Sequence, residues 1–476
     1  MRTLAQVLEE HPLPFALRHS TSSEWLDQYE AIEDLIHYPR AGLYAEVGTG
    51  KTVMATCLAL CWDAPVILCT MPPILFRQWK KWLESIGGIG DVLVYRGSVK
   101  ERKALQLKPR PGVRKWVLMT TGILKNDFTR IKAELGPIAK TVLVDEATAI
   151  KNADSGNHKA VAEIAEGQNL ALLTGTPLST PHDAYGYIKL ISPIVYRSKA
   201  QFDNIHVDTL DIFKKVTGWK NIELMKSNLM LNSIRLLKEQ VLSGLDKPNY
   251  IPITYDLSPE HYELYKELAE EQILELENGG KIDATSASKL YNALQQIVVN
   301  WDYFSGVEDA RSTAYDLVDR VMDDIDVMHP ASSKLIIASY YKITSRALLC
   351  YLQEFGAVGI YGEISAKQQE INSDRFENDP KCRIAVIQPQ SGGYGSNYQH
   401  VCSEVLFIES PRAPIHFNQV VGRVYRDGQK NVPNIHIGIA SGTIQKRLFE
   451  NMLTNDELLT QIQGGFKALR EAVYGR

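Results

Sequence analysis

The stretch GLYAEVGTGKTVMA, from Gly42 to Ala55, constrains this chain more than any other feature. An apolar run leads into a short glycine-rich turn, and a lysine–threonine pair opens a segment of helical character. Gly48 and Gly50 let backbone N–H groups approach phosphate oxygens, because glycine tolerates the unusual backbone angles. Lys51 supplies charge for the terminal phosphates, and the Thr52 hydroxyl can ligate Mg²⁺. The loop predicts a polyphosphate site formed by Gly48, Thr49, Gly50, Lys51 and Thr52.

The segment TVLVDEATAI supplies the acidic groups that such a site needs. Asp145 and Glu146 end an apolar strand, where Asp145 can hold Mg²⁺ and Glu146 can orient the attacking water as a general base. A lone Asp-Glu pair is more often a solvated strand end, and the loop alone departs from the strict pattern because Ala45 replaces its first glycine. Together the two motifs indicate an ATPase unit with ATP and Mg²⁺ as cofactors.

Two series of short apolar runs indicate an α/β fold with two tandem parallel sheets. The first series is AGLYAEV, PVILCTM, DVLVYRG, KWVLMTT, KTVLVDE and ALLTGTP, and the second is KLIIASY, AVGIYGE, RIAVIQP, EVLFIES and NIHIGIA. Each run ends in turn or polar residues, as buried parallel strands with crossover helices do. We expect a first lobe at 1–195, a mainly helical insertion at 196–330, a second lobe at 331–445 and closing helices at 446–476.

The clearest helix of the insertion is EHYELYKELAEEQILELENGG, which we expect to end at the Gly279–Gly280 pair. In the second lobe, QVVGRVYRDGQ places Gln419, Arg423 and Arg426 at a helical repeat of three to four residues. Surface ion pairing is the ordinary role of such arginines. The second lobe lacks its own phosphate loop, however, so its arginines suit an ATP site between two domains, closed by an arginine finger. We count these three residues, with Lys51, Asp145 and Glu146, as the candidate catalytic set.

Composition narrows the class of protein. The chain has 476 residues, 45% of them hydrophobic, and a formal net charge of −4, which argues against a general nucleic-acid coat but allows a local basic groove. Six cysteines without a Cys-x-x-Cys pair favour free thiols. No apolar stretch is long enough for a membrane span, and the first residues do not resemble a secretion signal. We therefore expect a cytoplasmic protein without a membrane partner.

The ordered motifs resemble those of the superfamily 2 helicases and translocases, and most closely the Swi/Snf-type branch. The resemblance runs from about Gln28 to Gln445. AEVGTGKT is similar to motif I, PVILCTMPPILFRQWKKWL to motif Ia, WVLMTTGILKND to motif Ib, DEATAIKN to motif II and LLTGTPLST to motif III. KLIIASYYKITSRALLCYL resembles motif IV, and SGGYGSNYQHVCSEVLFIESPRAPIHFNQVVGRVYRDGQ resembles motifs V and VI.

The resemblance implies two RecA-like lobes, DNA-dependent ATP hydrolysis and roles for further residues. Gln28 is the candidate for reading adenine, and the motif III residues that couple the ATP state to movement are Thr174, Gly175 and Thr176. The implied DNA contacts are Thr70, Arg77, Trp79, Thr120, Thr121, Ser339, Gly362 and Ser391. The chain departs from the family at Thr148, where motif II usually has His or Gln, and at Tyr394 and Tyr398 in motif V.

The basic segment VKERKALQLKPRPGVRKW is either a solvated connector or an extension of a DNA track that includes Lys108, Arg110 and Arg114. DNA is favoured over RNA because the Swi/Snf-type branch works on DNA. A motor of this size resembles those of bacteria and phages, including phage helicases that act at forks and junctions, so the expected function is a helicase that remodels forked or branched DNA. The alternatives are a duplex translocase that displaces proteins, an RNA helicase, a non-motor ATPase, and a DNA-binding protein with an inactive ATPase. No obligate protein partner is evident.

Overall fold

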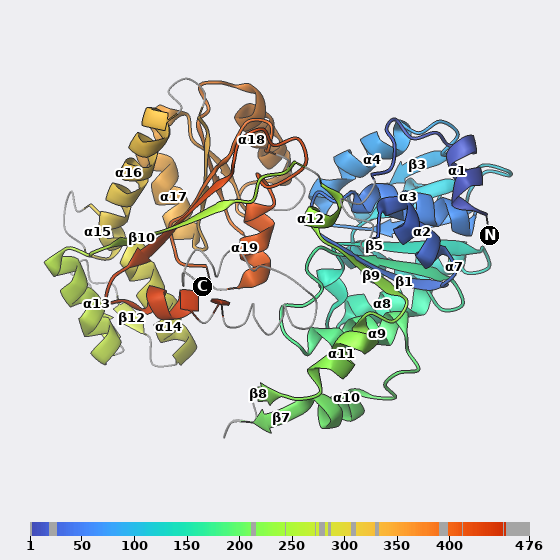
Figure 1. Cartoon of the computed structure of the whole chain (residues 1–476), viewed down its shortest axis with the longest axis horizontal. Helices are drawn as coiled ribbons and strands as arrows, with labels where there is room; N and C mark the ends of the chain where they lie inside the picture. Colours follow the sequence, from blue (N-terminus) through green and yellow to red (C-terminus); the bar gives the residue numbers. More distant parts are fainter. Residues whose placement is uncertain are drawn as a thin grey trace. The chain divides into compact units, whose positions relative to one another are not determined.

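The computed structural model describes most of the chain as two compact units, one up to Gly244 and one from Leu245 onward (Figure 1). The described residues are 2–18, 26–210, 216–242, 244–271, 273–275, 281–283, 287–305, 311–328, 333–389, 398–411, 413–450 and 452–453. Within them, no helix is both long enough and apolar enough to cross a membrane.

The first unit is built on a seven-stranded sheet in the order β3-β4-β2-β5-β6-β1-β9, with every neighbouring pair parallel. Parallel neighbours require crossovers, and helices supply most of them. Its strands are β1 (Arg40–Ala45), β2 (Val66–Thr70), β3 (Asp91–Val94), β4 (Lys115–Met119), β5 (Lys140–Asp145), β6 (Asn169–Leu173) and β9 (Ser233–Leu236). Its helices are α1 (Leu4–Glu10), α2 (Gln28–Ile36), α3 (Lys51–Trp62), α4 (Phe76–Glu84), α5 (Val99–Ala104), α6 (Thr121–Asn126), α7 (Phe128–Leu135), α8 (Gly156–Ile164), α9 (Asp183–Ile191), α10 (Lys199–His206), α11 (Ile222–Leu229) and α12 (Lys238–Val241).

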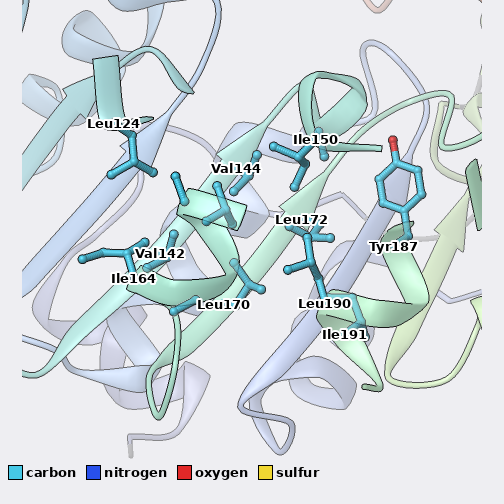
Figure 2. Packing of buried hydrophobic residues seen from close by; sticks show 14 of the residues in the cluster. Leu124, Val142, Val144, Ile150, Ile164, Leu170, Leu172, Tyr187, Leu190 and Ile191 are labelled. Carbon is cyan, nitrogen blue, oxygen red and sulfur yellow. The ribbon is translucent and has the colours of Figure 1, made fainter. Parts of the chain in front are cut away.

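The core of the first unit follows from the two-residue period of its strands. Val142 and Val144 of β5 face the same side as Leu170 and Leu172 of β6, and Figure 2 shows them packed with Ile164 of α8. The intervening Leu143 is equally buried and lies on the other face of the sheet. Both faces are therefore covered, which explains why these strands read as continuous apolar runs.

The second unit repeats this plan with a six-stranded parallel sheet in the order β10-β17-β16-β13-β15-β14. Ile336 and Ile337 are adjacent on β13 yet belong to two different core clusters, so this sheet is also buried on both faces. Its strands are β10 (Asn249–Tyr255), β13 (Leu335–Ala338), β14 (Val358–Ile360), β15 (Ile384–Ile387), β16 (Glu404–Phe407) and β17 (Asn434–Ala440). Its helices are α13 (Pro259–Glu271), α14 (Ala287–Val299), α15 (Trp301–Phe304), α16 (Thr313–Met328), α17 (Lys342–Tyr351), α18 (Ala366–Asn378) and α19 (Pro414–Val421).

The predicted α/β class with two tandem parallel sheets is confirmed. The predicted insertion is largely helical, but it also gives β9 to the first sheet and β10 to the second, together with the small hairpins β7 (Val207–Leu210) with β8 (Val216–Trp219) and β11 (Ile273–Glu275) with β12 (Lys281–Asp283). The prediction that the long helix reaches Gly279–Gly280 was wrong, because α13 ends at Glu271. The next residues pair as β11 with β12, and the Gly-Gly pair lies outside the described residues.

Candidate functional site

The predicted phosphate loop lies between the end of β1 and the start of α3. Gly48 and Gly50 both have left-handed backbone angles, with φ of 93° and 90°. Gly50 is the N-cap of α3 and caps it without a side chain, so the helix presents its N-terminal N–H groups to the loop. The ammonium of Lys51 donates to the Ala45 carbonyl at 2.8 Å and to the Glu46 carbonyl at 3.2 Å. The loop is thus wrapped around a positive charge, as an anion site requires.

Gln28 is buried against this loop. Its side-chain Nε2 donates to the Thr49 carbonyl at 2.7 Å, and its Oε1 accepts from the backbone N–H of Arg18 at 2.7 Å. The Arg18 guanidinium also donates to the Gly48 carbonyl at 3.1 Å. Gln28 therefore joins the first turn of α2 to the phosphate loop, while its predicted contact with adenine stays a prediction. Arg18 was missed by the sequence reasoning, because its contact depends on a loop fold that no motif encodes.

Asp145 and Glu146 meet the phosphate loop because β5, β6 and β1 are adjacent strands. In the parallel register, Asp145 pairs with Leu173, and Leu173 pairs with Leu43, so the three strands end at one edge of the sheet. The Asp145 carboxylate is buried and accepts hydrogen bonds from the Glu146 backbone at 2.9 Å and from the Trp79 indole at 2.7 Å. Burial raises the pKa of Asp145, and the Lys51 charge opposes that rise.

Glu146 has a backbone conformation that glutamate rarely adopts. Its φ of 52° and ψ of 58° lie in the left-handed region, where a non-glycine residue is strained. The turn redirects the chain from β5 into the following short helix, and the side chain of Glu146 is only partly buried. Thr148, the departure in motif II, donates its hydroxyl to the Glu146 carbonyl at 3.4 Å and so braces the same turn.

The three predicted coupling residues directly follow β6. The backbone N–H of Thr174 donates to the Leu43 carbonyl at 3.3 Å, and the Thr174 hydroxyl accepts from the Thr176 N–H at 3.2 Å. A Cβ on Gly175 would lie 3.3 Å from the Val47 nitrogen, so this glycine sits directly against the phosphate loop. The structure thus brings motifs I, II and III together at the edge of one sheet.

The strand β9 supports the phosphate loop, which the sequence motifs did not predict. The Arg235 guanidinium donates to the carbonyls of Tyr44 at 3.1 Å and Gly175 at 2.8 Å. The Glu46 carboxylate accepts from the Lys238 backbone at 3.0 Å and lies 3.7 Å from Arg235. Burial lowers the pKa of Arg235, and Glu46 opposes that fall. The segment IRLLKEQ held the signal, but only the sheet order places it beside β1.

These residues fit a nucleotide with its metal ion. The loop offers backbone N–H groups and the Lys51 charge to phosphates, and the Thr52 hydroxyl and the Asp145 carboxylate are oxygen ligands of the kind Mg²⁺ prefers. Asp145 Oδ1 accepts from the Glu146 N–H and Oδ2 from the Trp79 indole, and each oxygen has a second lone pair that suits the ion or its water. When bound, the ion would neutralise phosphate charge. In the described part of the chain, no cluster of three His, Cys, Asp or Glu side chains suggests any other metal site.

The predicted DNA-contact residues of the first unit differ in their exposure to solvent. Arg77 is exposed on α4, as a backbone contact requires. Thr120 caps α6 by accepting from the Ile123 N–H at 3.1 Å, while Thr70 and Thr121 are buried. Trp79 does not fit the prediction, because it is only 1% exposed and its indole is directed at Asp145. A side chain this buried has no face for a DNA strand.

Three cations of the basic segment form ion pairs with acidic residues outside it, which weakens the predicted DNA track. Arg110 forms two hydrogen bonds with Asp91, at 3.0 and 2.6 Å, and Arg114 pairs with Asp63 at 2.6 Å. Arg102, in the same segment, pairs with Asp127 at 2.7 Å. These partners come from other elements, so the local sequence could not show them. The exposed cations of the segment are Lys100, Lys103, Lys108 and Arg110.

The second unit holds the remaining predicted residues. Gln419 is buried on α19, and neither polar atom of its carboxamide has a hydrogen-bond partner among the described residues. The expected helical repeat was wrong beyond this point, because α19 ends at Val421. Arg423 is buried and Arg426 half-buried in the turn that follows.

Further predicted residues of the second unit lie at strand ends or outside the described part. Ser339 is buried and donates to the Glu409 carboxylate at 3.0 Å, while Gly362 is exposed. Tyr398 is buried, with its hydroxyl 2.9 Å from that of Ser373. Ser391 and Tyr394 lie outside the described residues.

A family model for the SNF2-related domain matches residues 31–300, more than half of the chain. The chain belongs to the SNF2-related family. The match includes the phosphate loop, Asp145 and Glu146, and the strand β9 that supports them.

Individual SNF2-type relatives are distant. The human "DNA annealing helicase and endonuclease ZRANB3" is 24% identical over 84% of this chain, and this alignment spans 36% of its own length. The Bacillus subtilis "Uncharacterized ATP-dependent helicase YqhH" is 23% identical over 89% of this chain and 78% of its own. Among solved structures, a Sulfolobus solfataricus SWI2/SNF2 ATPase core in complex with dsDNA is 20% identical in sequence. The match covers 98% of this chain and 99% of the Sulfolobus chain, with a TM-score of 0.42.

Proposed function

We propose that this protein is a DNA-dependent ATPase that uses ATP hydrolysis to move on DNA, and that it unwinds or remodels forked and branched DNA. The observation that carries the proposal is the convergence of Lys51 and Asp145, from motifs far apart in the sequence, at one edge of a parallel sheet. This is the edge where α/β proteins bind nucleotides. Membership of the SNF2-related family supports the nucleic-acid part of the proposal.

Each residue of the edge has a proposed role. Lys51 and the loop N–H groups bind the ATP phosphates, and Thr52 and Asp145 hold Mg²⁺. Glu146 accepts a proton from the attacking water, for which its position directly after the Mg²⁺ ligand is suitable. Gln28 contacts the adenine, and Thr174, Gly175 and Thr176 respond to the nucleotide, because Gly175 lies against the loop and Thr174 binds Thr176.

The second unit supplies the groups that stabilise the developing charge. In this proposal, Gln419, Arg423 and Arg426 are the catalytic residues of the second unit, and ATP turnover depends on DNA. An arginine supplied in this way accelerates related phosphoryl transfers by about 10³–10⁵-fold.

A duplex translocase that displaces proteins without separating strands is the second candidate. It is favoured by similarity to the Arabidopsis "CHD3-type chromatin-remodeling factor CHR7", 23% identical over 87% of this chain. In contrast, similarity to the human ZRANB3 and the Bacillus subtilis YqhH, both named as helicases, favours the helicase.

Strand separation distinguishes the two candidates. A labelled fork, a four-way junction, a blunt duplex and a triplex are each incubated with protein and ATP, and Lys51→Ala serves as the control without ATP turnover. Separation of fork or junction strands supports the helicase. Displacement of the third strand of the triplex alone assigns the protein as a duplex translocase, and the helicase proposal is then wrong.

A further inference from the structure

Helix α4 makes two side-chain contacts that lead to both proposed Mg²⁺ ligands. The Trp79 indole N–H donates to Asp145 Oδ2 at 2.7 Å. One turn later, the Trp82 indole N–H donates to the Thr56 hydroxyl at 3.0 Å, and that hydroxyl donates to the Thr52 carbonyl at 2.7 Å. Trp79 and Trp82 are three residues apart and therefore lie on neighbouring positions of one helix face.

The contact to Asp145 is more than the usual satisfaction of a buried indole. The buried Trp62 and Trp116 indoles donate to backbone carbonyls, those of Ile36 at 3.1 Å and Ile89 at 3.0 Å. Trp79 instead donates to an acidic side chain, and bonds to an ionised acceptor are stronger. Because the Glu146 N–H binds the other oxygen of Asp145, the carboxylate is held at both oxygens and its orientation is fixed.

The opposite face of α4 is basic and open. Arg77, Lys80 and Lys81 are exposed, whereas Phe76, Trp79 and Leu83 are buried. Glu84 lies 3.6 Å from Lys80 and offsets one of these three positive charges, so the face keeps a net positive charge. The helix therefore presents cations to solvent and indole donors to the nucleotide edge, only one helix diameter apart.

We propose that Trp79 and Trp82 are positioning residues for the Mg²⁺ ligands, and that α4 transmits binding of a DNA backbone on its basic face to the orientation of Asp145. This inference rests on the proposed function, for which it names a route by which DNA stimulates ATP turnover. A shift of α4 moves the indole that holds Asp145, and partners of metal ligands alter metal affinity by about 10–100-fold when removed.

The test compares Trp79→Phe with Trp116→Phe. Both substitutions keep an aromatic ring and remove one buried indole donor, but only Trp79 contacts Asp145. Binding of a fluorescent ADP analogue is titrated with Mg²⁺, and melting temperature reports folding. For Trp79→Phe we expect the half-saturating Mg²⁺ concentration to rise about tenfold or more. For Trp116→Phe we expect the wild-type value.

DNA stimulation supplies the second measurement. Trp79→Phe is expected to bind duplex DNA as the wild type does, yet to lose most of the stimulation of phosphate release, chiefly in kcat.

Thr56→Val removes the hydroxyl that connects Trp82 to Thr52 and is expected to raise the Mg²⁺ requirement, as Trp79→Phe does. The double variant Arg77→Gln with Lys81→Gln is expected to weaken duplex binding, and unchanged binding would overturn the role of the basic face.

Failure of this inference is distinguishable from failure of the proposed function. If Trp79→Phe matches Trp116→Phe in both Mg²⁺ requirement and DNA stimulation, then Trp79 only packs and the inference is wrong. If the wild-type protein shows no DNA-stimulated turnover, the proposed function is wrong, and the Mg²⁺ titration still decides whether Trp79 positions Asp145.

Discussion

Glu146 is the residue where backbone strain and proposed chemistry coincide. Its left-handed conformation, with φ of 52°, costs a non-glycine residue about 1–2 kcal/mol. Such strain persists where the surrounding structure imposes it, and it is common at functional sites. The side chain could be replaced by glycine at lower conformational cost, so its presence points to a role for the carboxylate.

We therefore predict that Glu146→Gly is more stable than Glu146→Ala. Both variants lose the carboxylate, but only alanine retains the strained Cβ, so their unfolding free energies should differ by about 1 kcal/mol. Urea denaturation measures the difference, and both variants should lose ATP turnover. An alanine variant as stable as the glycine variant would show that the turn is not strained.

Lys51 is the second residue whose side chain is essential to the proposed ATP site. Lys51→Ala removes the charge that the loop carbonyls surround, so ATP hydrolysis should fall to background while DNA binding remains near the wild-type level. Phosphate release and a duplex-binding titration measure the two properties. Loss of both together would indicate misfolding or a wrong assignment of the site.

At the scale of elements, the phosphate loop is held in shape by its fit against α2. A Cβ on Gly50 would lie 2.4 Å from Gln28 Nε2, and the φ of Gly50 is 90°. Gly167 also has positive φ, 65°, but open space surrounds the position of its Cβ. An alanine at either position would strain the backbone, but only an alanine at position 50 would also clash with a neighbouring side chain.

Gly50→Ala should destabilise the protein by clearly more than Gly167→Ala, and it should weaken nucleotide binding. Strain alone accounts for about 1–2 kcal/mol in each variant. In the background of Gln28→Ala, part of the additional loss at position 50 should be recovered. Thermal unfolding with and without nucleotide measures these effects, and equal losses for both glycines would exclude a tight fit between α2 and the loop.

The sequence was informative about elements whose pattern is local. KTVLVDE and KLIIASY became β5 and β13, because strands buried on both faces are written as continuous apolar runs. The edge strand β9 is only partly apolar, and its place beside β1 depends on pairing between residues far apart in the sequence. The helix α13 ends earlier than predicted for a similar reason, because Ile273–Glu275 forms β11 and pairs with β12 instead of extending the helix.

The candidate site follows the same division. Lys51, Asp145 and Gly175 could be predicted because each belongs to a motif with fixed local chemistry. The hydrogen bond from Trp79 to Asp145 joins residues 66 positions apart, and the ion pairs of Arg110 and Arg114 likewise cross between elements. Contacts of this kind depend on packing, which one sequence does not specify.

At the scale of the whole molecule, buried histidines predict a loss of stability in mild acid. Burial lowers the pKa of His158 and His206 in the first unit, and it lowers the pKa of His261 in the second unit to about 4. His261 stacks on Trp301, and its Nε2 lies 2.7 Å from the Ile297 carbonyl, which suits a neutral ring that donates.

The unfolded chain binds protons on these histidines at a higher pH than the folded protein does. Stability is therefore complete above about pH 6.5 and falls as the pH decreases towards 4, by up to about 3 kcal/mol for His261 alone. Urea midpoints between pH 7.5 and 5 measure this slope. His261→Phe keeps a ring against Trp301 and should show a shallower slope, whereas an unchanged slope would assign the acid sensitivity to other groups.

We propose above all that the edge formed by β1, β5 and β6 is an ATP site whose turnover depends on DNA. Phosphate release, measured with and without duplex DNA for the wild type and Glu146→Gln, tests it most directly. We expect strong stimulation by DNA in the wild type and turnover lower by orders of magnitude in Glu146→Gln. Wild-type turnover that is absent, or that does not respond to DNA, would contradict the claim.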